Sequence, residues 1–198
     1  MGFDSVALLV DVEKHFGISI SNEEAGKINT VQDFADCVFG KITFNPSQKC
    51  KSQILFYRFR SFFVETMGTD KRQIVPDRKL KDLVRIDELQ KTWMQIETFL
   101  NVKLPELSQL DFDATLGKEI KFFGPKFWTR KRPVTDGTVK DLINWTLSLN
   151  HEKFIDPKNL CDKTDIERIV TGIISESCGV PVDEIELRHS ITNDLGVD

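Results

Sequence analysis

The chain has 198 residues, enough for one large or two small domains. With 40% hydrophobic and 29% charged residues it has the composition of a packed fold, which excludes general disorder. No apolar run approaches the roughly 20 residues of a membrane span, and the first residues do not resemble a secretory signal, so we expect a cytoplasmic protein without a transmembrane segment. Dispersed cysteines and histidines predict neither a metal site nor a Ser-His-Asp triad, so no enzyme class is supported. The cysteines are Cys37, Cys50, Cys161 and Cys178, and the histidines are His15, His151 and His189.

Charge is distributed in blocks along the sequence. Residues 1–43 carry a net charge of −4 and residues 162–198 carry −6, whereas residues 44–161 carry +6. Both ends are therefore acidic and the middle is basic. This pattern indicates different surfaces and different partners for the two parts, or simply solvated faces of opposite sign.

Apolar residues recur at helical spacing in six segments, and alternation typical of strands is nearly absent, so the chain is predicted to be all-α. The first helix is capped by Asp4 or Ser5 and ends at Gly17, and glycines also close the third and sixth helices. The expected inward residues are, helix by helix, Val6, Leu9, Val12 and Phe16; Phe34 and Val38; Ile54, Phe59, Phe62, Phe63 and Met67; Leu89, Trp93, Ile96 and Leu100; Leu142, Trp145 and Leu149; and Ile166, Ile169, Val170, Ile173 and Ile174.

An internal repeat underlies this succession of helices. The middle of the chain holds one complete unit, and the two ends hold a second unit cut in two, with its first half at the C-terminus. The predicted domains are therefore residues 1–43 plus 162–198, and residues 44–161. The matching pairs of segments are 12–20 with 96–104, 30–34 with 138–142, and 170–191 with 59–80.

Once rejoined, the cut unit resembles an acyl carrier protein, a four-helix bundle. The resemblance rests on D-S-V at residues 4–6, V-E-x-x-F-G-I-x-I at 12–20 and E-E-A-x-K-I-x-T-V-x-D at 23–33. The first helix and long loop of the family, ending in D-L-G-x-D, correspond to residues 166–198. The predicted fold is thus two acyl-carrier-like bundles, one built from both chain termini in a circularly permuted order.

The resemblance implies that Ser5 carries a covalent 4′-phosphopantetheine, with Asp4 as its motif neighbour. The arm would hold acyl groups as thioesters for fatty-acid, polyketide or related biosynthesis. A phosphopantetheinyl transferase would attach it, and acyl-loading and acyl-using enzymes would dock on the helix through Val6, Asp11 and Glu13. The alternative is an interaction module with the same fold that is never modified. Without the flanking motifs, a helix N-cap is the favoured explanation of Asp4 and Ser5, and with them the carrier function is favoured.

The middle unit lacks the serine, because Glu88 or Leu89 takes its place, and is expected to be a degenerate carrier-like domain. It carries an insertion at about 108–134, whose segment 118–132 has a net charge of +5 and four aromatic residues. This segment either binds an anionic partner or covers its own domain's core, and we expect no nucleic-acid partner. The missing helix of residues 1–43 comes from residues 162–198 of the same chain or of a swapped dimer. For closure within one chain, Ser5 and Asp198 are expected to lie close together.

Overall fold

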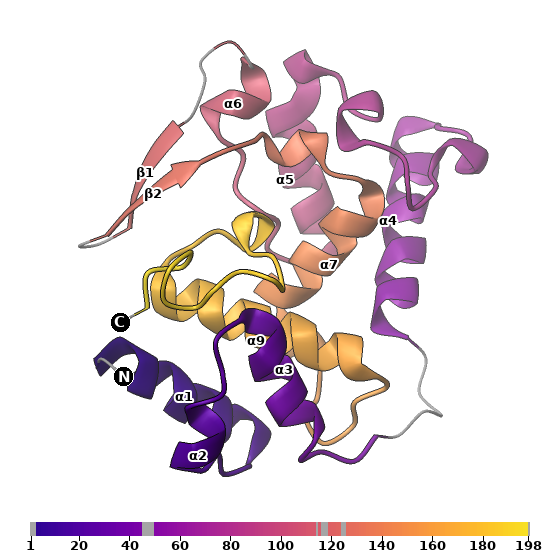
Figure 1. Ribbon diagram of the computed structural model, residues 1–198. Coiled ribbons are helices and arrows are strands. Elements are labelled where there is room, and N and C mark those ends of the chain that lie inside the picture. Colours follow the sequence, from indigo (N-terminus) through magenta and orange to yellow (C-terminus); the bar gives the residue numbers. More distant parts are fainter. Residues whose placement is uncertain (1–2, 45–49, 114, 116–118, 124–125, 198) are drawn as a thin grey trace. The chain divides into compact units, whose positions relative to one another are not determined.

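The computed structural model describes residues 3–44, 50–113, 115, 119–123 and 126–197. The chain divides into two compact units (Figure 1). Unit 1 contains residues 1–49 together with residues 151–198, and unit 2 contains residues 50–150. The predicted helical class is confirmed, and to the helices the structure adds one short hairpin. Asp198 lies outside the described residues, so its expected place beside Ser5 stays a prediction.

In unit 1, the long helix α9 packs against helices from the other end of the chain, α1 and α3, and against the short helix α8 (Figure 1). Five apolar residues of α9 are buried, and all five were predicted to face the core: Ile166, Ile169, Val170, Ile173 and Ile174. The helices of the unit are α1 (Phe3–Phe16), α2 (Asn22–Ala25), α3 (Val31–Phe39), α8 (His151–Phe154) and α9 (Lys163–Cys178), followed by a 3-10 turn at Val182–Glu184.

In unit 2, α4 packs against α5 and α7 around a core that includes Phe59, Phe62 and Phe63. Strands β1 and β2 form an antiparallel hairpin in which Glu119 pairs with Arg130 and Phe123 with Lys126. The elements of the unit are α4 (Lys51–Met67), α5 (Leu89–Leu100), α6 (Gln109–Phe112), β1 (Glu119–Phe123), β2 (Lys126–Arg130) and α7 (Val139–Leu149), with short 3-10 turns at 71–73, 80–82, 86–88 and 134–136.

The two units repeat the same hydrogen bonds across the long loop that follows their longest helix. In unit 1, an antiparallel bridge joins Thr30 to Ser190, and in unit 2 one joins Lys79 to Thr138. Thr30 and Thr138 each form a capping box with an aspartate three residues on. The flanking bonds also correspond: Val31 N–H to His189 O, Gln32 N–H to Leu187 O and Ile191 N–H to Asn29 O in unit 1; Val139 N–H to Arg78 O, Lys140 N–H to Pro76 O and Leu80 N–H to Gly137 O in unit 2.

Left-handed glycines end the long helices α4 and α9. Gly68 has φ 65° and Gly179 has φ 69°, a region that a residue with a Cβ enters only at a steric cost. Gly17, with φ 64°, follows α1. These three glycines stand where the sequence predicts helix ends.

Several predicted inward residues are exposed instead. Val6 of α1 is 47% exposed, and the buried residues of that helix are Leu8 and Val12. In α4, Ile54 and Met67 are exposed. In α1, residues 6–10 are all apolar, so the sequence does not show which of them face the core. In α4, Ile54 and Met67 lie near the ends of the helix. Neither Asp4 nor Ser5 is an N-cap, because α1 already begins at Phe3.

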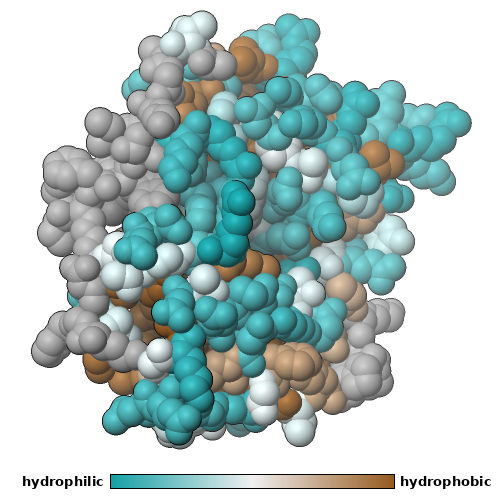
Figure 2. Space-filling model, viewed as in Figure 1, coloured by the Kyte–Doolittle hydropathy of each residue, from teal (hydrophilic) through white to brown (hydrophobic). Residues whose placement is uncertain are grey.

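On the face shown in Figure 2, hydrophilic residues predominate and hydrophobic ones occur in small separate patches. Of the helices that the structure describes, none combines the length and the apolar character needed to cross a lipid bilayer.

Candidate functional site

Ser5 lies in the first turn of α1, and its side chain is half-buried. The first N–H groups of a helix have no intrahelical acceptor, and the helix dipole gives this end a partial positive charge. A phosphate joined to Ser5 Oγ would therefore stand in a favourable electrostatic environment.

A cavity of about 430 Å³ opens beside Ser5 within unit 1. Its walls come from α1, from the end of α2 and the segment that joins it to α3, from α3 and from the C-terminal loop. Most of the side chains in them are apolar, so the cavity can receive an aliphatic group attached near the serine. The lining residues besides Ser5 are Leu8, Leu9, Ala25, Gly26, Ile28, Asn29, Phe34, Ile191 and Thr192.

The outward face of α1 combines apolar and acidic side chains. Val6 and Val10 are 47% and 50% exposed, and Asp4 and Asp11 are exposed beside them. Such a face suits a transient contact with a basic partner surface, because the carboxylates give a salt-dependent attraction and the valines give buried apolar area.

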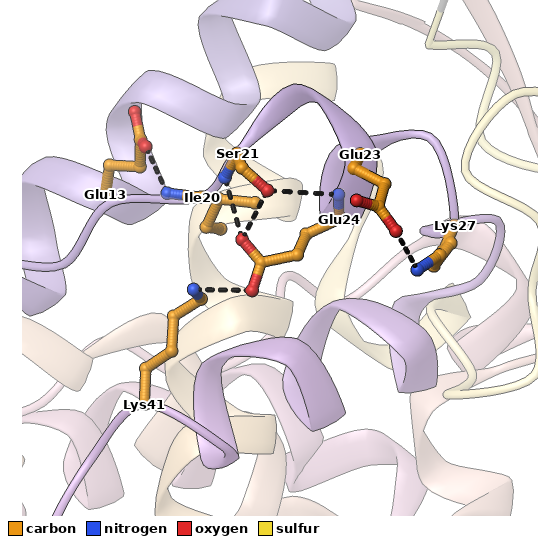
Figure 3. Close-up of polar contacts among 7 residues, drawn as sticks. All are labelled: Glu13, Ile20, Ser21, Glu23, Glu24, Lys27 and Lys41. Carbon is orange, nitrogen blue, oxygen red and sulfur yellow. Dashed lines mark hydrogen bonds and ion pairs between the residues drawn. The ribbon is translucent and has the colours of Figure 1, made fainter.

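Glu13, the third predicted docking residue, is used within the fold. The N–H of Ile20 donates to Glu13 Oε1 at 2.6 Å, so this carboxylate closes the turn that follows α1 (Figure 3). In unit 2, Leu104 N–H donates to Glu97 Oε1 at 2.9 Å, across the same separation of seven residues. The glutamate that follows Val12 in unit 1 and the one that follows Ile96 in unit 2 are thus both structural residues.

Two comparisons with known proteins found no match, since neither a family model nor a solved structure matches the chain. A third found an acyl carrier protein from Thermosynechococcus vestitus that is 46% identical over 39 residues. Part of this chain is similar to an acyl carrier protein. The match covers 20% of this chain and 48% of the relative, so the chain spans about half the length of the curated relative it matches.

Unit 2 has no hydroxyl at the position that corresponds to Ser5. The shared glutamate contacts align Glu13 with Glu97, and the same offset aligns Ser5 with Leu89, whose side chain is 2% exposed. Where a half-buried serine lines a cavity in unit 1, unit 2 buries a leucine at the start of α5. Of the two aligned positions, only the one in unit 1 holds a serine.

The turn that follows α1 is also held by an ion pair. Glu24 completes a capping box with Ser21, and its second oxygen contacts Lys41 Nζ at 2.6 Å (Figure 3). The bond from Lys41, followed by those from Ser21, lowers the pKa of Glu24 to about 2 from the ordinary 4.5. A lowered pKa contributes stability that is complete above pH 4.5 and is lost as the pH falls towards 2.

We expect Lys41→Met to raise the pKa of Glu24 towards 4.5, because the largest cause of its lowering is removed. Titration of the side-chain carboxyl resonances by NMR measures this directly. Lys27→Met is the matched control, since Lys27 pairs with the neighbouring Glu23 at 2.8 Å and leaves Glu24 unchanged. A Glu24 midpoint that stays near 2 in Lys41→Met would contradict the assignment.

The structure corrects the expectation that the histidines are isolated. The rings of His15 and His151 lie with their centroids 5.1 Å apart, although 136 positions separate them in sequence. Contact across such a separation has no local sequence signal. Across the described ranges, the structure contains no group of three or more His, Cys, Asp or Glu side chains that could hold a metal ion.

The basic, aromatic segment 118–132 contains the hairpin of β1 and β2, where no secondary structure was predicted. Two features of its sequence are typical of a hairpin and were not used in the prediction. They are the short alternating run at 119–123 and the turn dipeptide Gly124-Pro125. The side chains of its four aromatic residues lie outside the part of the structure that is described.

Proposed function

We propose that residues 1–43 and 162–198 form one acyl-carrier bundle that bears 4′-phosphopantetheine on Ser5. The observation that carries this proposal is the half-buried serine of the D-S-V motif, in the first turn of α1 beside a cavity whose lining residues are more often apolar than polar. The likeness to an acyl carrier protein supports it. So does the compact unit in which residues from both ends of one chain lie together.

The residues of unit 1 fit such a group in three ways. The Ser5 hydroxyl provides the attachment atom, and the N-terminal turn of α1 stabilises the negative charge of a phosphodiester there. The cavity beside it can shield an apolar chain from water. When bound, the arm supplies a terminal thiol that holds acyl groups as thioesters.

In this proposal the chain is a carrier without catalytic residues of its own. A separate phosphopantetheinyl transferase modifies Ser5, and loading and using enzymes dock on α1 through Val6 and Asp11, both exposed. Because one oxygen of Glu13 already binds the Ile20 N–H, we expect Glu13 to contribute less to docking than Asp11. Fatty-acid, polyketide or related biosynthesis is the setting that this chemistry suggests.

Incubation with coenzyme A and a phosphopantetheinyl transferase is expected to increase the intact mass by one phosphopantetheinyl group. Ser5→Ala is expected to abolish the increase, and Ser19→Ala, at an exposed position in the turn after α1, to retain it. The proposal fails if the wild-type mass is unchanged with transferases of several specificities, or if Ser5→Ala is still modified.

The second candidate is an interaction module that is never modified. It is favoured by unit 2, where the aligned position holds the buried Leu89 and the same loop hydrogen bonds are retained without a modifiable serine. An unchanged wild-type mass in the experiment above is the result that this alternative expects.

A further inference from the structure

The contact between His15 and His151 holds a separate segment of unit 1 against two helices. His15 lies near the end of α1, and His151, 1% exposed, begins α8. Further along this segment, Ile155 is 2% exposed and its N–H donates to His151 O at 2.9 Å. Leu160 is fully buried. Residues 151–160 are thus docked through one histidine and two apolar side chains.

Charged groups from three helices line a cavity beside the histidine pair. A cavity of about 480 Å³ is lined by both imidazoles together with Ile173 and Ser177 of α9. The titratable and charged groups facing it are Asp11 and Lys14 from α1, Glu152 from α8 and Glu176 from α9. The centroid of the His15 ring lies 5.1 Å from that of His151 and 5.3 Å from that of Phe16.

We propose that His15 and His151 form a pH-sensitive latch, in which residues 151–160 stay docked on α1 and α9 while His15 is neutral and are released when His15 is protonated. A protonated ring carries N–H donors on both nitrogens. His15 Nε2 is buried and has no hydrogen-bond partner among the described residues, so protonation places an unsatisfied, charged donor there.

Burial is the first cause that lowers the pKa of His15 below 6.5, and the neighbouring His151 is the second. Glu152 acts in the opposite direction and ranks third. In the released state the ring is solvated and its pKa returns towards 6.5. Protons therefore bind more tightly to the released state, so the docked state is fully stable above pH 6.5 and loses stability as the pH falls through this window.

Amide hydrogen exchange of Ile155 in the full chain tests the latch. After correction for intrinsic exchange, the opening equilibrium is expected to be constant above pH 6.5 and to rise by up to tenfold per pH unit below it, because one proton is taken up on opening. His15→Phe is expected to give a flat profile. Unit 2 accepts this ring at the aligned position, where Phe99 follows Glu97 by two residues.

A second variant and a matched control complete the test. His15→Gln, which is polar and does not titrate, is expected to give the same flat profile. His189→Gln removes another histidine of unit 1, one whose Nδ1 accepts the Glu186 N–H, and is expected to keep the wild-type slope. The latch is overturned by a pH-independent wild type, by a slope that persists in both His15 variants, or by a slope that vanishes in His189→Gln.

Discussion

Truncation of Ile169 to alanine is expected to destabilise unit 1 by about 2–5 kcal/mol, the usual cost of removing a large buried aliphatic side chain. Ile169 is fully buried on α9, the helix from the C-terminal part of the chain that packs against α1 and α3. The cavity left behind weakens the contact between the two ends of the sequence. Amides of α1 and α3 should therefore exchange faster, although the substitution lies more than 100 residues away in sequence.

Hydrogen exchange combined with urea unfolding measures both effects. Ser177→Ala is the control, because Ser177 is an exposed residue of the same helix and its substitution is expected to change the free energy of unfolding by less than about 0.5 kcal/mol. Unchanged protection of α3 amides in Ile169→Ala would show that residues 162–198 do not complete the bundle of residues 1–43.

Replacement of Asp111 by alanine is expected to destabilise unit 2 by about 3–5 kcal/mol. Asp111 is 3% exposed and its carboxylate accepts four hydrogen bonds, from the N–H and hydroxyl groups of Ser108 and Thr135. Its Oδ2 atom also lies 4.0 Å from Arg130 Nη1, and the Arg130 side chain is fully buried. Loss of this carboxylate leaves buried donors unsatisfied and a buried guanidinium without its neighbouring anion.

Asp113→Ala provides the comparison two residues further on. Asp113 is exposed and accepts from the N–H and hydroxyl of Thr115, so its loss is expected to destabilise unit 2 much less than the loss of Asp111. Thermal or urea unfolding of the two variants gives the difference directly. Equal destabilisation by the two substitutions would contradict the role of Asp111 in joining residue 108 to residue 135.

Features set by neighbouring residues were predictable from the sequence. The T-x-x-D motifs at 30–33 and 138–141 are capping boxes, and Gly68 and Gly179 end their helices in the left-handed conformation. These signals succeed because a cap or a positive φ depends on a few adjacent residues and little on the rest of the chain. The inward face of α9 was equally clear, because its apolar residues recur strictly at helical spacing.

Features that depend on distant parts of the chain were missed. The burial of Leu8 instead of Val6 is decided by what α9 and the loops place against α1, and the local sequence is apolar on both sides. The histidine pair and the Asp111 cluster join residues far apart in sequence. The position of Ser5 in a helical first turn was predictable, whereas the cavity beside it was not, because its walls come from four separate segments.

The interleaved order of the two units has a consequence for synthesis on the ribosome. Unit 2 is contiguous and is translated completely before α9, so it can emerge from the ribosome and fold first. Helices α1 and α3 must wait for about 120 further residues, roughly 6–25 s at ordinary elongation rates. During that interval Leu8, Val12 and Phe34 lack their partner helix. We therefore expect the nascent N-terminal segment to depend on chaperones until α9 emerges.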